Sequence, residues 1–372
     1  MSALVDACPA CLRRGHLVGF LAPHLAGVLD RRERDRDRVR LRGLLALDDA
    51  DLVRAVAGGA AGEATRLLEE FDAHAAVERL EARRIAAVCR HSPSYPRSLS
   101  ALVDSPATLF GTDSADRLSE LLEGPAVALV GARRASPYGL EMAYELGRGL
   151  GAAGVTVVSG LALGIDAAAH RGCLDAGGGA IGVLAGGPDV PYPRSNLGLY
   201  ERLHRDGIVV SELPPQVRPF RWAFPARNRI MAGLSAATVV VEAADPSGSL
   251  ITSAFAEQMG RTVAAVPGRA TARLAEGVNN LIKDGALVVT SAADLLDELF
   301  GVGTRSDPRR PVIAPADPVD ASILEAVEAD LDIDGICASA GLPVREARAA
   351  LTRLEMAGRV RRDGLGAYHR TA

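Results

Sequence analysis

Between residues 126 and 290 the sequence repeats one pattern, a short apolar run followed by a helical stretch. The apolar runs are AVALV, VTVVS, AIGVLA, IVVSE, ATVVVEA, TVAAVP and ALVVT. Strands that alternate with helices form parallel sheets, and strands that are apolar along their whole length fit a sheet covered on both faces. The pattern therefore predicts an α/β fold with a doubly wound, mostly parallel, Rossmann-like sheet.

The segments on either side have a different character. Residues 1–92 show helical periodicity and no strand pattern, which predicts a small helical, SAM-like domain. Residues 301–318 carry four prolines and little periodicity, as linkers do. Residues 319–372 show three helical segments and then a hairpin pattern, the order of a winged helix-turn-helix. Because 372 residues exceed what one core usually serves, we expect this winged helix and the core over 93–300 to be separate domains.

Charge and cysteine content limit the class of protein. The net charge of −4 means that any binding of nucleic acid must come from local clusters of cations. The N-terminus lacks a signal-peptide pattern, and no uncharged apolar run reaches membrane-spanning length, so we expect a cytoplasmic chain with no membrane segment. Five cysteines are an odd number and do not suit a secreted disulfide framework.

The loops after the predicted strands hold most of the unusual residues. Ligands of open parallel sheets bind beyond the carboxyl ends of the strands, where helix N-termini offer backbone N–H groups. The residues predicted to bind phosphate there are Gly131, Ser159, Gly160, Gly164, Ser247, Gly248, Ser249 and Thr252. Each glycine has the alternative of serving only a tight turn, but that does not explain SGS at the start of a helix. The first loop reads GARRASPYG rather than GxGxxG, so we expect no nicotinamide or flavin cofactor.

The segment RPFRWAFPARNRI at 218–230 interleaves arginines with aromatic residues. Aromatic faces can stack on bases while guanidinium groups contact phosphates, which suits binding of single strands without sequence preference. The alternative is that Trp222 and Phe224 belong to the hydrophobic core.

Several ordered motifs resemble the DprA/Smf family of DNA-processing proteins. They are VALVGARRASPYG, SGLALGIDAAAH, YPRSN, SELPP, FPARNRIMAGLS, SGSLITSAFAEQMGR, VPG and GVNNLIKDGA, and they span about 93–300. YPRSL and DSPATLFGTD resemble the family's approach to this core.

The resemblance implies a protein that binds single-stranded DNA and catalyses no reaction. On matching positions it implies DNA contacts from Arg133, Arg194, Arg221, Phe224, Arg227, Asn228, Arg229, Arg261 and Lys283. It further implies protection of incoming DNA in natural transformation and recombination, loading of RecA past single-strand-binding protein, and a homodimer formed through the core.

Two other classes of protein stay open. The first is a nucleotide-phosphate hydrolase on the same kind of sheet, with Asp166, Glu242 and Glu257 as candidate carboxylates. The five-residue spacing from Thr252 to Glu257 does not match such hydrolases, and His170, four residues after Asp166, reads as incidental. The second is a winged-helix transcription factor with a ligand-sensing core.

The N-terminal region lacks the glycine-hairpin pattern of many relatives but carries CPAC at 8–11 and CRH at 89–91. Cys8, Cys11, Cys89 and His91 could converge around a structural zinc ion. The alternative is cysteines that are simply buried or reduced.

Overall fold

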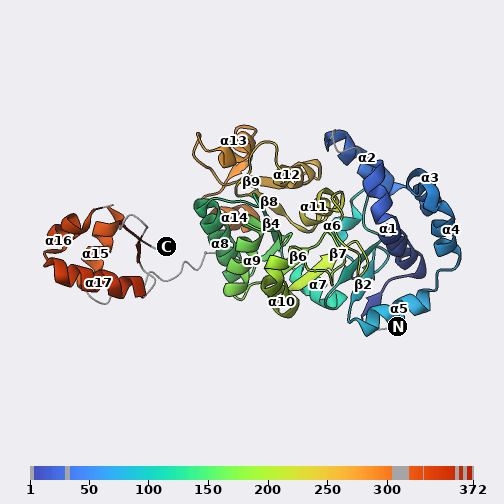
Figure 1. Ribbon diagram of the computed structural model, residues 1–372, viewed down its shortest axis with the longest axis horizontal. Helices are drawn as coiled ribbons and strands as arrows, with labels where there is room; N and C mark the ends of the chain where they lie inside the picture. Colours follow the sequence, from blue (N-terminus) through green and yellow to red (C-terminus); the bar gives the residue numbers. More distant parts are fainter. Residues whose placement is uncertain are drawn as a thin grey trace. The chain divides into compact units, whose positions relative to one another are not determined.

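The computed structural model describes residues 4–29, 34–303, 318–329, 331–356, 360–362 and 367–370. The chain divides into two compact units, Met1–Pro308 and Arg309–Ala372 (Figure 1). The boundary falls inside the predicted linker, most of which, residues 304–317, lies outside the described residues. None of the helices in the described part of the chain has the length and apolar character that crossing a membrane requires.

A ten-stranded sheet in the order β1-β2-β3-β7-β6-β5-β4-β8-β9-β10 forms the centre of the larger unit. The strands are β1 (Val5–Asp6), β2 (Ala86–Cys89), β3 (Thr108–Gly111), β4 (Ala126–Val130), β5 (Thr156–Ser159), β6 (Ala180–Val183), β7 (Ile208–Ser211), β8 (Ala237–Val240), β9 (Thr262–Ala265) and β10 (Leu287–Val288). Among the described strands of this ten-stranded sheet, only the pairs β2–β3 and β3–β7 are antiparallel. The predicted doubly wound, mostly parallel sheet is confirmed, and the seven predicted runs are β4 to β10.

Helices cover both faces of the sheet, because the strands carry apolar side chains on both sides. Along β4, Val127 and Leu129 pack on one face and Ala126 and Val130 on the other. The first face is covered by α8 (Pro137–Ala152), α9 (Ile165–Asp175), α10 (Leu197–Asp206) and α14 (Ala292–Phe300). The second is covered by α6 (Arg97–Ser100), α7 (Ala115–Leu121), α11 (Ala223–Leu234) and α13 (Glu276–Lys283), with α12 (Ser249–Gln258) packed on α11. Two 3-10 turns, η2 (Arg194–Asn196) and η3 (Arg273–Ala275), lie in the connecting loops.

The N-terminal region is not a separate helical domain, and the expectation that it holds no strand is wrong. Its helices are α1 (Pro9–Val28), α2 (Arg34–Ala46), α3 (Asp49–Val56), η1 (Gly58–Ala60), α4 (Ala61–Glu69) and α5 (Ala73–Ala82). Helices α1 to α4 share a hydrophobic cluster with residues of the core, and the Trp222 indole N–H donates to the Ala22 carbonyl at 2.7 Å. β1 and β2 join the sheet. Periodicity could not reveal strands of two and four residues beside helices.

The smaller unit has the fold of a winged helix, as predicted. It contains α15 (Pro318–Glu328), α16 (Ile333–Ala340) and α17 (Val344–Met356), followed by the antiparallel strands β11 (Val360–Arg362) and β12 (Tyr368–Arg370). Gly341 ends α16 with φ of 64°, a left-handed conformation that glycine adopts without strain and that lets the chain turn into α17.

Candidate functional site

A cavity of about 360 Å³ lies at the carboxyl ends of the strands. Its position is the switch point of the sheet, because β4 pairs in parallel with β5 on one side and with β8 on the other. Three segments supply the predicted site residues that line it: Gly131 and Arg133 after β4, the α11 residues Phe224, Arg227 and Asn228, and the loop of Ser247, Gly248 and Ser249 with Thr252. Residues from three separate parts of the sequence therefore come together in one cavity.

An arginine and two aromatic rings form a cluster beside the cavity. The Arg133 guanidinium carbon lies 5.0 Å from the centre of the Phe224 ring, within cation–π distance. The Tyr192 ring lies 5.6 Å from the Phe224 ring at 57°, and its residue is 45% exposed. We call Arg133, Phe224 and Tyr192 the aromatic–arginine cluster. Tyr192 is not among the residues predicted from the sequence. The available signal was an aromatic residue close to Arg194 in the YPRSN motif.

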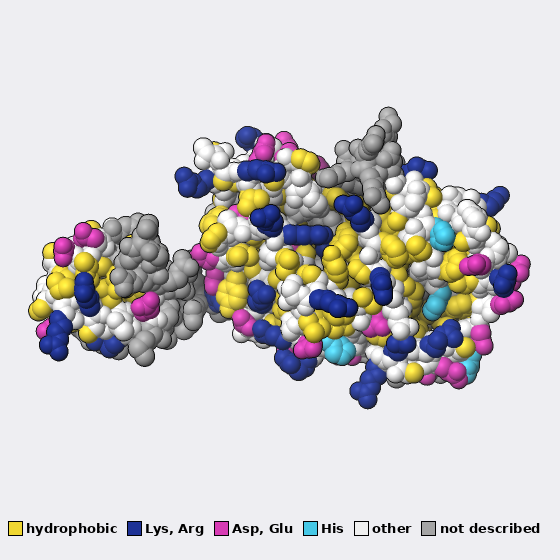
Figure 2. All heavy atoms as spheres, in the orientation of Figure 1, with side chains coloured by type: hydrophobic (Ala, Val, Ile, Leu, Met, Phe, Trp, Pro, Cys, Tyr) yellow, Lys and Arg dark blue, Asp and Glu magenta, His cyan; other side chains and the backbone are white. Residues whose placement is uncertain are grey.

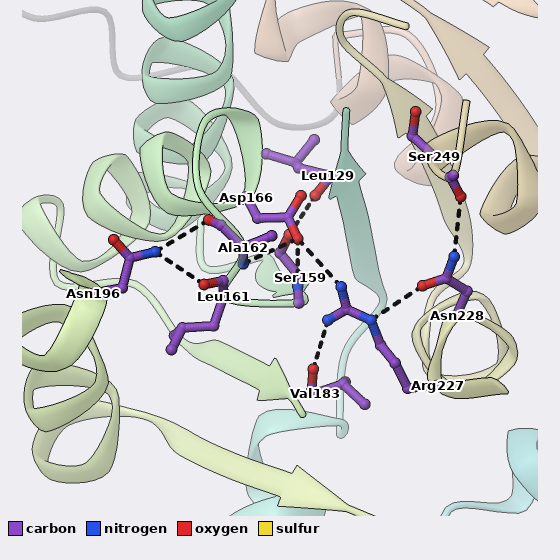
Figure 3. A network of polar contacts seen from close by, with 12 residues as sticks. Leu129, Ser159, Leu161, Ala162, Asp166, Val183, Asn196, Arg227, Asn228 and Ser249 are labelled. Carbon is purple, nitrogen blue, oxygen red and sulfur yellow. Dashed lines mark hydrogen bonds and ion pairs between the residues drawn. The ribbon is translucent and has the colours of Figure 1, made fainter. Parts of the chain in front are cut away.

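A buried ion pair forms the inner wall of the cavity (Figure 3). The Arg227 Nη2 atom lies 3.7 Å from the Asp166 Oδ2 atom, and both side chains are less than a tenth exposed. Arg227 also donates to the Val183 carbonyl at 2.7 Å and to the Asn228 side-chain oxygen at 3.1 Å. Burial raises the pKa of Asp166 although Arg227 opposes the change, and burial lowers the pKa of Arg227 to about 10. Arg227 therefore stays cationic at neutral pH.

Two of the predicted phosphate-binding groups instead bind the protein itself, so those predictions are wrong. The Ser159 hydroxyl is fully buried and donates to the Leu129 carbonyl at 2.6 Å. The Gly160 N–H donates to the Asp166 carboxylate at 3.2 Å, and that of Ala162 to the same oxygen at 3.4 Å. Asp166 thus occupies the position that a bound anion would take.

The glycines of these loops allow close packing within the protein. A Cβ on Gly131 would lie 2.5 Å from the Ile165 side chain, and one on Gly164 would lie 2.2 Å from the Ala132 carbonyl oxygen. Gly164 also has φ of 77°. Gly131 remains a predicted contact because it lines the cavity, whereas Gly164 does not line it.

The loop at 247–249 opens toward the cavity at the start of α12. The Ser247 and Ser249 hydroxyls are 2.8 Å apart, and the Asn228 amide donates to the Gly248 carbonyl at 3.1 Å. The Thr252 hydroxyl is buried and has no hydrogen-bond partner among the residues that the structure describes. Hydroxyls and a helix N-terminus in this arrangement suit an anion.

The remaining predicted cations divide into exposed and internal groups. Arg194, Arg221 and Lys283 are exposed and do not line the cavity. On the face drawn in Figure 2, Lys and Arg side chains are spread across the middle of the larger unit, while Asp and Glu lie mainly near its periphery.

Arg229 and Arg261 are predicted DNA contacts whose guanidinium groups instead bind the protein itself, Arg229 fully buried and Arg261 half-buried. The Arg229 side chain has no exposed surface and pairs with Glu212 at 2.7 Å and with Asp104 at 3.0 Å. Arg261 donates to the backbone carbonyls of Ala232 and Ser235. Both guanidinium groups are used within the fold, so neither is available to a phosphate.

The candidate carboxylates of a hydrolase are not free to act on a substrate. Asp166 is held by Arg227 and by two backbone N–H groups. Glu242 accepts hydrogen bonds from the backbone N–H and the hydroxyl of Ser136. Glu257 is exposed on α12 and does not line the cavity. A general base needs to reach the reacting proton, so this arrangement does not favour hydrolysis.

His170 behaves as a buried neutral residue rather than as an acid or base. Burial lowers its pKa from 6.5 to about 4. His170 in the unfolded chain therefore binds a proton near pH 6.5, whereas in the folded chain it binds one only near pH 4. The free energy of unfolding must therefore decrease as the pH is lowered through that interval. We expect wild type to lose more unfolding free energy between about pH 7 and pH 5 than His170→Gln does, as measured by urea denaturation. Equal losses would contradict this prediction.

The four predicted metal ligands converge at a second place, outside the strand-end cavity. One donor atom from each of Cys8, Cys11, Cys89 and His91 lies within 4.8 Å of all the others. None of these residues lines the cavity at the switch point.

Comparison with known proteins gives the family. The model of DNA recombination-mediator protein A matches residues 86–300, and that of the DprA winged helix domain matches 307–364. A putative DNA processing protein DprA of Mycobacterium tuberculosis is 37% identical over 365 residues, which is 95% of this chain and 85% of that protein.

Two solved structures are similar to this one. The DNA processing protein A of Streptococcus pneumoniae has a TM-score of 0.61 and 32% identity, covering 79% of this chain and 99% of that chain. The second is a structure of DNA processing protein A from Helicobacter pylori, determined in work on how that protein binds single-stranded DNA. It has a TM-score of 0.52 and 26% identity, and the match covers 58% of this chain and 95% of that chain. Sequence motifs, sheet topology and both family models agree, and the chain belongs to the DprA/Smf family of DNA-processing proteins.

Proposed function

We propose that this protein binds single-stranded DNA at the strand-end cavity and catalyses no reaction there. The observation that carries the proposal is the aromatic–arginine cluster beside a cavity that holds a buried cation and an anion-binding loop. An exposed ring offers a stacking face to any base, and a neighbouring guanidinium offers a partner to the phosphate. The binding is therefore expected to depend on salt and to show little sequence preference.

The two parts of the site would act on different parts of a nucleotide. Phe224 and Tyr192 would stack on bases, while Arg133 would contact the backbone beside them. The hydroxyls of Ser247 and Ser249 and the backbone N–H groups at the N-terminus of α12 would donate hydrogen bonds to a phosphate. The Thr252 hydroxyl would supply a further donor from within the cavity. The exposed residues Arg194, Arg221 and Lys283 would lengthen the track for the strand. The DNA strand would follow these cations beyond the cavity, because each phosphate that a cation neutralises releases counterions and so favours binding.

Removing the aromatic–arginine cluster should weaken DNA binding by two separable mechanisms. For Phe224→Ala we expect a loss of about 1–3 kcal/mol, roughly 5-fold to 150-fold in Kd, because a stacked base loses its platform. For Arg133→Ala we expect weaker binding and a salt-dependence slope lower by about 0.7, the contribution of one phosphate on a single strand. Fluorescence anisotropy with oligo-dT at several salt concentrations measures both effects.

The matched control is Arg83→Ala, which removes an exposed cation at the end of α5. Arg83 does not line the cavity, so its loss should leave both Kd and salt slope close to wild type. Unchanged binding by the double variant of Arg133 and Phe224 would refute the site.

RecA loading and homodimer formation are proposed from the family resemblance. RecA filament formation on DNA coated with single-strand-binding protein tests the first, and the mass of the protein in solution tests the second. Stimulation by wild type that is lost in the Phe224→Ala variant would connect the loading activity to this cavity. The absence of stimulation by wild type would leave only the DNA-binding proposal.

A further inference from the structure

The N-terminal region brings together four side chains that metals prefer. Cys8 and Cys11 lie at the start of α1, Cys89 ends β2, and His91 follows it. The His91 Nδ1 atom lies 3.5 Å from the Cys8 sulfur and 3.3 Å from the Cys11 sulfur. All four donor atoms lie within 4.8 Å of one another. We call these residues the cysteine–histidine cluster.

The spacing of the donor atoms is that of a tetrahedral zinc site. Zn–S bonds of about 2.3 Å and a Zn–N bond of about 2.0 Å separate sulfur from nitrogen by about 3.5 Å and two sulfurs by about 3.8 Å. The two sulfur–nitrogen distances already agree with this geometry. All four donor atoms lie within 4.8 Å of one another, so no separation exceeds the tetrahedral edge by more than about 1 Å, which a small rotation of one side chain removes. We propose that the cysteine–histidine cluster binds a structural zinc ion.

The backbone around the cluster supports thiolate ligands. The Cys8 N–H donates to the Cys89 sulfur at 3.4 Å. Hydrogen bonds of this kind orient metal-bound sulfur atoms and stabilise their charge. Three thiolates around Zn²⁺ carry a net negative charge, which the neighbouring Arg90 and the N-terminal end of the 20-residue helix α1 both favour.

The donor set indicates a structural rather than a catalytic ion. Four protein ligands fill a tetrahedron and leave no position for water or substrate. Cys11 and Cys89 are buried and pack with Ala107, and of the four ligands only His91 is exposed. The metal would therefore be enclosed by Cys11 and Cys89 on the protein side and would face solvent on the side of His91 and the half-buried Cys8.

The zinc ion would fasten the N-terminal region to the sheet. Cys8 and Cys89 are separated by 81 positions, so one ion closes a long segment of chain. β1 pairs with β2 through only two residues, and the cluster lies directly beside this pair. α1 then continues onto the core, where Gly19 lies against Pro214. Loss of the ion should loosen β1 and α1 together.

Metal analysis of the full-length chain, with any affinity tag removed, tests the proposal. We expect about one zinc ion per chain in wild type and in Cys337→Ser, and far less in Cys11→Ser and Cys89→Ser. Cys337 is the matched control because it lies on α16 in the other unit. A folded wild-type protein without zinc after growth in zinc-containing medium would overturn the proposal, and so would equal zinc loss in Cys337→Ser.

A second measurement covers the case in which the cysteine variants do not fold. Titration of wild type with a mercurial reagent should release zinc in proportion to thiol modification, and the melting temperature should fall as zinc leaves. Cobalt substituted for zinc should show thiolate charge-transfer absorption and the intense visible bands of a tetrahedral ion. Release of no metal, or a disulfide among Cys8, Cys11 and Cys89 in peptides mapped without reductant, would refute the site.

Discussion

Arg229→Ala is expected to lower the free energy of unfolding by about 3–5 kcal/mol. The change leaves Glu212 without its cation, and it leaves Asp104 with only the partly exposed Arg42, whose Nε atom lies 3.5 Å from the Asp104 carboxylate. The Arg229 and Asp104 side chains have no exposed surface, and Glu212 is only 14% exposed. Charges that lose their partner inside a protein are not rescued by water. Urea denaturation followed by the fluorescence of Trp222, the single tryptophan, reports on the larger unit that contains this ion cluster.

Arg221→Ala provides the matched control for this prediction. It removes the same side chain eight positions earlier in the same motif, but Arg221 is exposed. We expect a change in stability within about 0.5 kcal/mol and a loss of DNA affinity instead. A stable Arg229→Ala protein with weakened DNA binding would reverse the interpretation and return Arg229 to the DNA-binding set.

Gly147→Ala is expected to destabilise the larger unit by about 3 kcal/mol, because it separates two helices that touch through their backbones. A Cβ on Gly147 in α8 would lie 2.2 Å from the Ala169 carbonyl oxygen, and one on Gly172 in α9 would lie 2.0 Å from that of Tyr144. Backbone atoms in packed helices cannot move aside as a flexible side chain can. Since α9 begins next to Asp166, the same change should also shift the wall of the cavity and weaken DNA binding.

Gly43→Ala makes the identical chemical change where space is open. Gly43 is exposed within α2, and a Cβ there would meet nothing within 4 Å. Alanine is the better helix former, so we expect stabilisation by about 0.5–1 kcal/mol. Opposite signs for the two variants in the same denaturation experiment would confirm that contact, rather than helix propensity, decides the outcome. Equal effects at Gly43 and Gly147 would contradict it.

Part of the candidate site could be predicted from the sequence because it depends on the ends of strands. Seven apolar runs marked β4 to β10, and the loops after them had to meet at one edge of a parallel sheet. Arg133 and Ser249 could therefore be assigned to one cavity although they are far apart in the chain, whereas Phe224 was expected there only from the family resemblance. The roles of neighbouring arginines could not be assigned in this way. Arg227 and Arg229 lie two residues apart on α11, yet one lines the cavity and the other pairs with Asp104 in the interior.

The sequence by itself determined the mostly parallel sheet, the winged helix and the edge of the sheet at which ligands would bind, because these follow from local hydrophobic patterns and chain order. Only the tertiary structure decided which polar groups are available to a ligand. Ser159 and Arg229 have the right chemistry for phosphate, but burial and internal partners use their hydrogen-bonding capacity. The convergence of Cys8 with Cys89 likewise needed the pairing of β1 with β2, a contact across 81 positions that no local pattern encodes.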